Sequence, residues 1–345
     1  MLRTGLCDLL GIELPIIQAG MGVFTSAELV AAVSNAGGLG SLGTGLRPVE
    51  SLSWKNINSG NYMKPDGPRP AVSLGEELPR IRELTDRPFA VNYTLSQVNE
   101  EIFTTILAAK PPLISFALSD PGDFVMRAHA VGSLVMHQVT TVQQAEQAAA
   151  RGVDIIVAQG SEAGGFGGKV AAMVLIPQAV AAVRPIPVVA AGGIADGLGL
   201  AAALVLGAQG VNLGTRFLAS LEAPISNNWK QVIISAKSED AIKVEVWNKI
   251  FPWNPLAYET VPRAIHTPFI EKWQEHGEIT EQEAKVLRGE VIAAIQQGRM
   301  EEFIPWAGQT VGLVHEVLPA AEIVRRIAAE AEEALKSIKA KYLDV

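Results

Sequence analysis

Short apolar runs recur along the first two thirds of the chain, and each is followed by a stretch in which apolar residues return every three or four positions. The runs are typical of buried strands, and the stretches between them are typical of amphipathic helices. Several of the helical stretches open on Ser, Asp, Asn or Thr and end at Gly, as helix boundaries do. The predicted strands are 14–20, 38–43, 89–94, 113–118, 133–139, 154–160, 187–193 and 210–215.

The regular alternation of strands and helices indicates parallel strands joined by crossover helices. Eight such strands favour an α/β fold of the (β/α)8 TIM-barrel type, with an open doubly wound sheet as the alternative. In a barrel every strand ends at the same face, and that face carries the active site. Residues that directly follow the predicted strands are therefore the first candidates for chemistry.

Two segments interrupt the alternation. Residues 51–73 are polar and contain Gly and Pro, so they form either a lid over the barrel face or a tolerated surface insertion. Residues 222–305 carry four tryptophans and read as mostly helical. We expect three parts: a barrel over 1–221, a smaller helical substrate or cap domain over 222–305, and a return to the barrel with a final amphipathic helix over 306–345.

Composition narrows the class of protein. The chain has 345 residues, 48% of them hydrophobic, and a net charge of −8, which argues against a nucleic-acid partner. No apolar run is long enough to span a membrane, so we expect no membrane partner. Cys7 is the only cysteine, and the first residues lack the pattern of a signal peptide, so we expect a cytoplasmic protein. A homodimer is the assembly we consider, and no spacing of His and Cys indicates a metal site.

Uncharged polar residues gather at the predicted strand ends. Amide side chains donate and accept hydrogen bonds at once, as a flat heterocycle with a mixed edge requires, although each could instead satisfy a loop backbone. Glycines follow the seventh and eighth strands in "AAGGIADG" and "NLGTRF", where barrels often bind phosphate through backbone N–H groups. The polar residues and the methionine near them are Gln18, Met21, Asn92, Gln138, Gln159 and Asn212.

Six ordered motifs together resemble the nitronate monooxygenase family, and through it the FMN-dependent bacterial enoyl-ACP reductases. They are "PIIQAGMG", "AVNYT", "AQGSEAGGFGG", "VVAAGGIADG", "GVNLGTRF" and "WAGQTVGLV". The resemblance implies a TIM barrel that binds FMN at the strand ends and acts on a small molecule with O2. It implies that the following residues contact FMN: Gln18, Met21, Asn92, Gln138, Gln159, Gly164, Gly165, Gly192, Gly193, Asn212, Leu213, Gly214, Thr215 and Gln309.

The sequence departs from the family at Phe166. Family members commonly carry a histidine there, which is assigned as the base that removes a proton from the carbon beside the nitro group. Phenylalanine accepts no proton, whereas a nitronate is already deprotonated and needs no base. We therefore expect oxidation of nitronates to survive and oxidation of neutral nitroalkanes to be weak. His137, at the end of the fifth strand, is the substitute base if it points inward; otherwise it is a histidine held in a loop.

Three functions remain open at this point. The first is an FMN-dependent monooxygenase of alkyl nitronates. The second is an NAD(P)H-dependent flavin reductase that passes electrons to a quinone or an enoyl thioester, because hydride transfer to flavin needs no protein base. The third is a flavin-binding protein without turnover, which the intact FMN motifs disfavour.

Overall fold

The computed structural model describes residues 2–45, 72–95, 98–251 and 257–342. Eight parallel strands form its main sheet, in the order β1-β9-β8-β6-β5-β4-β3-β2. Every strand predicted from the sequence is present, which confirms the predicted barrel class. The strands are β1 (Ile16–Gln18), β2 (Gly40–Gly43), β3 (Phe89–Thr94), β4 (Leu113–Ala117), β5 (Leu134–Val139), β6 (Ile155–Gln159), β8 (Val188–Ala191) and β9 (Gly210–Leu213).

The two outer strands of this sheet, β1 and β2, meet and close the barrel. Ile17 and Leu39 form a parallel bridge, and the backbone N–H of Gln18 donates to the Leu39 carbonyl at 2.9 Å. The Gln18 side chain extends the seam, because its Oε1 accepts from the Ser41 N–H at 2.9 Å and its Nε2 donates to the Ser41 carbonyl at 3.1 Å. A side-chain amide thus takes the place of a peptide group between the two strands.

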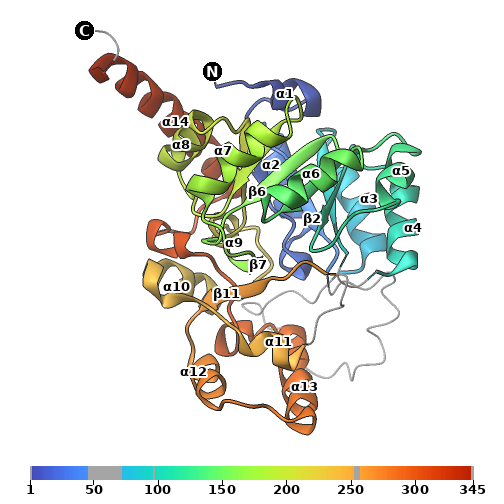
Figure 1. Ribbon diagram of the computed structural model, residues 1–345, viewed down its shortest axis with the longest axis vertical. Helices are drawn as coiled ribbons and strands as arrows, with labels where there is room; N and C mark the ends of the chain where they lie inside the picture. The colour runs from blue at the N-terminus through green and yellow to red at the C-terminus, as the bar shows by residue number, and fades with distance from the viewer. Residues whose placement is uncertain (1, 46–71, 96–97, 252–256, 343–345) are drawn as a thin grey trace.

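Helices surround the barrel, as the sequence predicts (Figure 1). Ser26, Thr141 and Asp196 accept hydrogen bonds from backbone N–H groups at the starts of α2, α6 and α8, which confirms the expected caps. The predicted amphipathic C-terminal helix is α14, and it packs on α8 and α2. The surrounding helices are α2 (Ala27–Asn35), α3 (Leu74–Leu84), α4 (Glu100–Ala109), α5 (Phe124–His129), α6 (Val142–Ala150), α7 (Ala172–Ala182), α8 (Gly197–Val205), α9 (Thr215–Leu218) and α14 (Ala320–Tyr342).

The barrel interior is apolar at its amino end. A short helix that the sequence pattern did not predict, α1 (Gly5–Leu10), contributes Leu6, Cys7 and Leu10 to the same buried cluster as the inward side chains of the strands. Cys7 is fully buried there. Because the amino end is filled with hydrocarbon, polar chemistry is confined to the carboxyl end. The inward apolar side chains are Ile17, Leu39, Ala90, Leu113, Met136, Ile155, Val157, Val189 and Ala191.

The segment after β9 forms a smaller layer at the carboxyl end of the barrel (Figure 1). It contains the predicted helices and also two strands that were not predicted. Its elements are α10 (Asn227–Ser235), β10 (Ala241–Lys243), α11 (Val246–Ile250), β11 (Val261–Ile265), α12 (Pro268–Glu275) and α13 (Glu281–Gln297). We call this layer the cap. Most of the predicted lid or insertion at 51–73 lies outside the described residues, so both interpretations of it stand.

The cap is joined to the barrel by a three-stranded antiparallel sheet of order β10-β11-β7. Its third strand, β7 (Gly165–Gly167), comes from the glycine-rich stretch after β6, and Phe166 lies opposite Pro262. The glycine-rich stretch therefore supplies an edge strand to the cap. The proposed division into parts at residue 221 remains a prediction, and this sheet runs across it.

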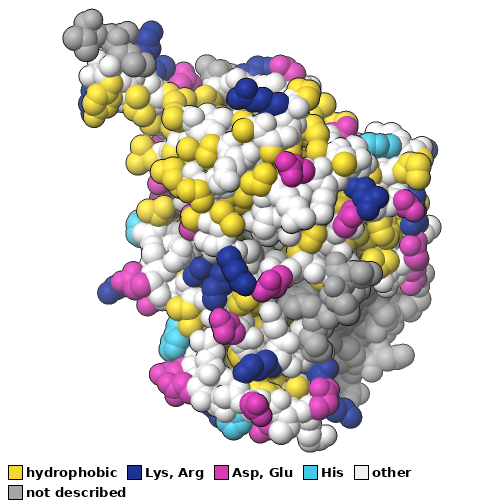
Figure 2. Space-filling view, in the orientation of Figure 1, with side chains coloured by type: hydrophobic (Ala, Val, Ile, Leu, Met, Phe, Trp, Pro, Cys, Tyr) yellow, Lys and Arg dark blue, Asp and Glu magenta, His cyan; other side chains and the backbone are white. Residues whose placement is uncertain are grey.

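Charged side chains are interspersed over the surface. On the face seen in Figure 2, acidic and basic groups alternate, and hydrophobic side chains gather over α7, α8 and α14. Met173, Val174, Leu198 and Val205 are among the exposed apolar residues of α7 and α8. Among the described helices, none is both long enough and apolar enough to cross a bilayer.

Candidate active site

A layer of uncharged polar side chains lines the barrel at its carboxyl end. Side chains alternate along a strand, so residues two positions beyond an inward apolar residue also point inward. Asn92 and Gln159 are placed this way and are mostly buried. Asn212 is also mostly buried and lies between Val211 and Leu213, which belong to the other cluster, between the strands and the helices. Gln138 follows Met136 and is half-buried. Ser41 and Ser115, which the sequence analysis did not single out, complete the layer on β2 and β4.

Several atoms of this layer are buried without a partner among the described residues. They are Gln159 Oε1, Asn212 Oδ1 and the Ser41 hydroxyl. Asn92 Nδ2 makes only long contacts, at 3.3 Å to the Ser115 hydroxyl and 3.4 Å to its carbonyl. Buried polar atoms normally have hydrogen-bond partners, because a buried atom without a hydrogen bond costs about 1–3 kcal/mol of stability. The layer is therefore incomplete by itself and fits a polar ligand with a donor-rich edge.

The glycines after β8 and β9 border the same layer. Gly192 and Gly193 have φ values of +84° and +74°, a region that favours glycine. A Cβ on Gly192 would lie 2.8 Å from the Gly160 carbonyl, so this glycine is also required for packing against the end of β6. Gly214 lies beside Met21, whose sulfur would be 3.6 Å from a Cβ at 214. The structure thus places one predicted phosphate glycine, Gly214, beside the predicted ring neighbour Met21.

The segment around Gly308 and Gln309, after the cap, returns to the carboxyl end of the barrel. The Gln309 N–H donates to the Glu162 carbonyl at 2.9 Å, and the Gly308 N–H donates to the Thr215 hydroxyl at 2.8 Å. A Cβ on Gly164 would lie 2.4 Å from Gly308 N, so the two backbones touch directly. Gly160 and Gly168 are also in close contact with other parts of the chain, whereas a Cβ on Gly165 would meet no atom within 4 Å. Whether Gly164, Gly165 and Gln309 also touch a cofactor remains a prediction.

Glu162, in the centre of that stretch, holds a helix start. Both of its carboxylate oxygens lie 3.1 Å from the Ala172 N–H, which donates to them at the beginning of α7. A carboxylate at a helix N-terminus is stabilised by the free N–H groups there. Glu162 therefore stabilises the start of α7.

Of the two interpretations of His137 that the sequence leaves open, its contacts fit a structural histidine and not a base that points into the barrel. His137 alternates with the inward Met136 and Gln138 and lies on the side of Val135 and Val139, which pack against the helices. It is fully buried, and its Nε2 lies 3.0 Å from the Tyr258 hydroxyl. Burial lowers its pKa to about 4, with Asp120 opposing the shift. His137 is a neutral structural residue outside the polar layer.

Phe166 lies in an aromatic cluster between the barrel and the cap. Its ring centre is 5.9 Å from that of Trp247 and 5.6 Å from that of Trp306. Trp306 is in turn 5.6 Å from Phe24, which follows β1. These separations are typical of favourable aromatic pairs. Phenylalanine at this position is thus accounted for by packing, and it supplies no proton acceptor.

Gln18 and Leu213 use much of their hydrogen-bonding or packing capacity within the protein. Gln18 is fully buried and its amide closes the seam between β1 and β2, so its predicted position near a flavin ring stays a prediction. Leu213 is buried in the layer between barrel and helices, which leaves its backbone as the part that could face a ligand. Asn92, Gln138, Gln159 and Asn212 are the side chains best placed to do so.

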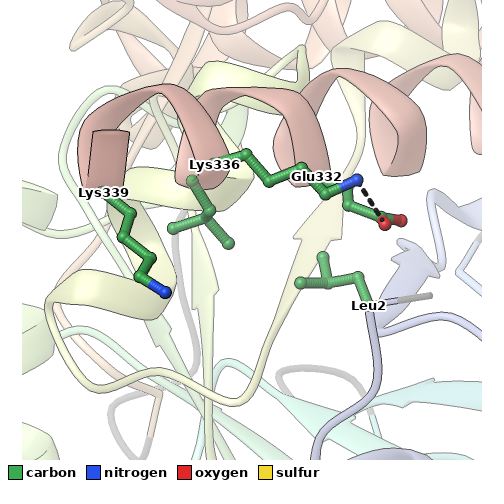
Figure 3. Close-up of a pocket in the computed structure, with 5 residues that line it drawn as sticks. Leu2, Glu332, Lys336 and Lys339 are labelled. Carbon is green, nitrogen blue, oxygen red and sulfur yellow. Dashed lines mark ion pairs between the residues drawn. The ribbon is translucent and has the colours of Figure 1, made fainter. Parts of the chain in front are cut away.

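A hollow at the other end of the molecule offers no comparable chemistry. It has a volume of about 280 Å³ and lies between the N-terminal segment and α14 (Figure 3). Leu2, Leu335 and Lys339 line it, and Glu332 and Lys336 form an ion pair of 2.9 Å at its edge. The carboxyl end of the barrel is therefore the candidate active site.

Comparison with known proteins decides the family. The sequence matches the nitronate monooxygenase family over residues 3–330. The chain belongs to the nitronate monooxygenase family. It is accordingly an enzyme, an oxidoreductase of the FMN-dependent type. A probable nitronate monooxygenase of Staphylococcus saprophyticus is 31% identical over 386 aligned positions, which cover 96% of this chain and 98% of that protein.

Other similar proteins carry names that differ from nitronate monooxygenase. A hydroxy-methyl-oxo-octahydro-indene-carboxyl-CoA dehydrogenase of Mycobacterium tuberculosis is 34% identical over 68% of this chain, and the alignment spans 61% of that protein. The structure of FabK from Thermotoga maritima is 32% identical, with a TM-score of 0.82 over 99% of both chains. A nitroalkane oxidase from Streptomyces ansochromogenes is 26% identical, with a TM-score of 0.78 over 96% of this chain and 99% of that chain.

Proposed function

We propose that this protein binds FMN at the carboxyl end of the barrel and oxidises alkyl nitronates with O2. The observation that carries the proposal is the polar layer, whose buried Gln159 Oε1 and Asn212 Oδ1 lack partners among the described residues. Oxygen acceptors of this kind suit the N–H edge of a flavin ring. The family membership supplies the class of reaction.

The residues present fit the cofactor in two regions. Asn92, Gln138, Gln159 and Asn212 would hold the ring by its polar edge, with Met21 beside it. The backbone N–H groups of Gly192, Gly193, Gly214 and Thr215 would hold the phosphate, with Leu213 contributing only its backbone. FMN, when bound, would supply the electron acceptor and the reaction with O2.

The choice of nitronate over neutral nitroalkane follows from the absence of a base at 166. Removal of a proton from carbon needs a positioned acceptor, commonly worth a factor of about 10²–10⁴ in rate. Phe166 accepts no proton, His137 lies outside the layer, and Glu162 is occupied at the start of α7. A nitronate enters already deprotonated, so this chain only has to bind it, orient it and exclude water.

A second function is favoured by the likeness to FabK over the whole chain. In this alternative the protein would take electrons from NADH or NADPH and pass them to a quinone or an enoyl thioester. Use of NAD(P)H remains a prediction. This alternative predicts that the protein steadily consumes NADH or NADPH when no nitronate is present.

One experiment separates the two functions. Purified FMN-loaded protein is mixed without oxygen with NADH, with NADPH and with propyl nitronate, and bleaching of the visible flavin band is followed by stopped flow. Bleaching by nitronate but by neither nicotinamide supports the monooxygenase. Fast bleaching by a nicotinamide with none by nitronate would overturn the proposal in favour of the reductase.

A further inference from the structure

Two cationic side chains of the cap lie on one face of the small sheet. Lys243 of β10 is opposite Arg263 of β11, and Arg263 is opposite Gly165 of β7. Directly opposed residues share a face of a sheet, whereas Phe166 is on the other face. A Cβ on Gly167 would lie 3.4 Å from Lys243 Nζ and 3.5 Å from Gln159 Oε1. The face with the cations is therefore the one turned toward the polar layer.

Backbone carbonyls fix both cations in position. Lys243 Nζ donates to the carbonyls of Val261, Gly167 and Gly168 at 3.0, 3.2 and 3.3 Å. Arg263 donates from Nε and Nη2 to the Ser161 carbonyl, at 3.3 and 3.0 Å, and from Nη1 to the Ala241 carbonyl. These contacts satisfy N–H groups but carry no counter-charge, because a carbonyl has no net charge. The nearby negative charge is that of Glu162, which raises the pKa of both cations without forming an ion pair with either among the described residues.

Within the described parts of the chain neither cation has an ion-pair partner, although Arg263 is only 9% exposed. Burial, with Arg263 adding to it and Glu162 opposing it, lowers the pKa of Lys243 to about 8. Lys169 offers a contrast, since it pairs with Glu259 at 2.7 Å while both are exposed. Buried charges are normally paired, so an anion is the expected occupant beside Lys243 and Arg263.

We propose that Lys243 and Arg263 form the subsite for the planar oxyanion of the substrate, the O–N–O group of a nitronate. The flat fork of a guanidinium matches such a group, and two N–H groups of Arg263 have no acceptor within the described residues. The identity of the anion rests on the proposed function, while the existence of an anion subsite does not. The subsite selects the deprotonated form of the substrate, which complements the lack of a base at 166.

The test uses FMN-loaded protein and propionate, a non-reacting carboxylate of similar shape, with propionamide as its neutral counterpart. Binding is measured by calorimetry and by the change in the visible flavin spectrum. We expect propionate to bind at least about tenfold more tightly than propionamide. Lys243→Met should weaken propionate at least about tenfold, Lys243→Arg should retain binding within about threefold, and Lys169→Met, the matched exposed control, should change nothing.

Equal binding of propionate by the parent and by Lys243→Met, with FMN content unchanged, would overturn the subsite. Should Lys243→Met fail to hold FMN, the unmodified protein decides: equal affinity for propionate and propionamide, or no binding of propionate, overturns it as well. The two proposals fail separately. Propionate binding without nitronate oxidation removes the proposed function alone, and nitronate oxidation with an unchanged KM in Lys243→Met removes the subsite alone.

Discussion

The contact between Gly164 and the returning segment yields a quantitative prediction for Gly164→Ala. A Cβ at this position would lie 2.4 Å from Gly308 N, 2.5 Å from the Ala307 carbonyl carbon and 2.8 Å from Ala307 Cα. All three neighbours are backbone atoms, so no side-chain rotation relieves the overlap. Overpacking costs about 1–3 kcal/mol, and we expect the upper end of this range here. The melting temperature should fall by roughly 5 °C.

The same change elsewhere should have the opposite sign. Gly289 is an exposed residue within α13, and a Cβ there would meet no atom within 4 Å. Gly289→Ala should raise the free energy of unfolding by about 0.5–1 kcal/mol, because glycine inside a helix is less favourable than alanine by that amount. The pair separates a steric effect at 164 from any general effect of added methyl groups.

The assay is denaturant unfolding of both variants, with FMN affinity measured alongside by fluorescence. Gly164→Ala should weaken FMN binding as well, since the segment 307–309 rests on the stretch that borders the polar layer. A Gly164→Ala protein as stable as the parent would refute the contact between these backbones. Retained stability with weakened FMN would instead place the role of Gly164 at the cofactor.

Three further substitutions test other parts of the account. Phe166→Leu should lower the free energy of unfolding by about 1–3 kcal/mol, since it removes the aromatic contacts with Trp247 and Trp306, each worth roughly 0.5–1.5 kcal/mol. Nitronate turnover should be kept, and loss of turnover at full FMN content would contradict this. Gln159→Ala should weaken FMN binding about tenfold by fluorescence titration, and an unchanged affinity would remove Gln159 from the site. His137 has a folded pKa of about 4, below its ordinary value of 6.5, so the unfolded chain takes up a proton between these pH values that the folded chain does not. Stability should therefore fall, by up to about 3 kcal/mol, as the pH drops from 6.5 to 4, and His137→Gln should flatten that dependence in pH-resolved unfolding; an unchanged slope would count against burial of the imidazole.

Local pattern was sufficient for the barrel. Each strand lies within a short, mostly apolar run, and the crossover helices follow from the spacing of these runs. The same alternation carries side-chain direction, which is why Asn92, Gln159 and Asn212 could be placed at the mouth. It also carried the signal for Ser115, two positions beyond the inward Leu113, and for the outward direction of His137, one position beyond Met136.

Contacts between segments that are distant in the sequence could not be predicted from local patterns. The strand β7 contains two glycines and one phenylalanine, and it exists because β11, nearly a hundred residues later, pairs with it. Lys243 and Arg263 carry no motif, and only that pairing brings them toward Gln159. The sequence analysis assigned Gly164 to FMN, and its backbone contact with Gly308 could not be predicted from the stretch itself.

The most direct test of the central claim compares the anionic and neutral forms of one substrate. FMN-loaded protein is mixed without oxygen with propyl nitronate and, separately, with the neutral nitropropane at the same concentration, before the neutral form has time to ionise. The account predicts rapid bleaching of the flavin by the nitronate and bleaching by the neutral compound slower by about 10² or more. Equal rates with the two forms would show that a base is present after all and would contradict the account.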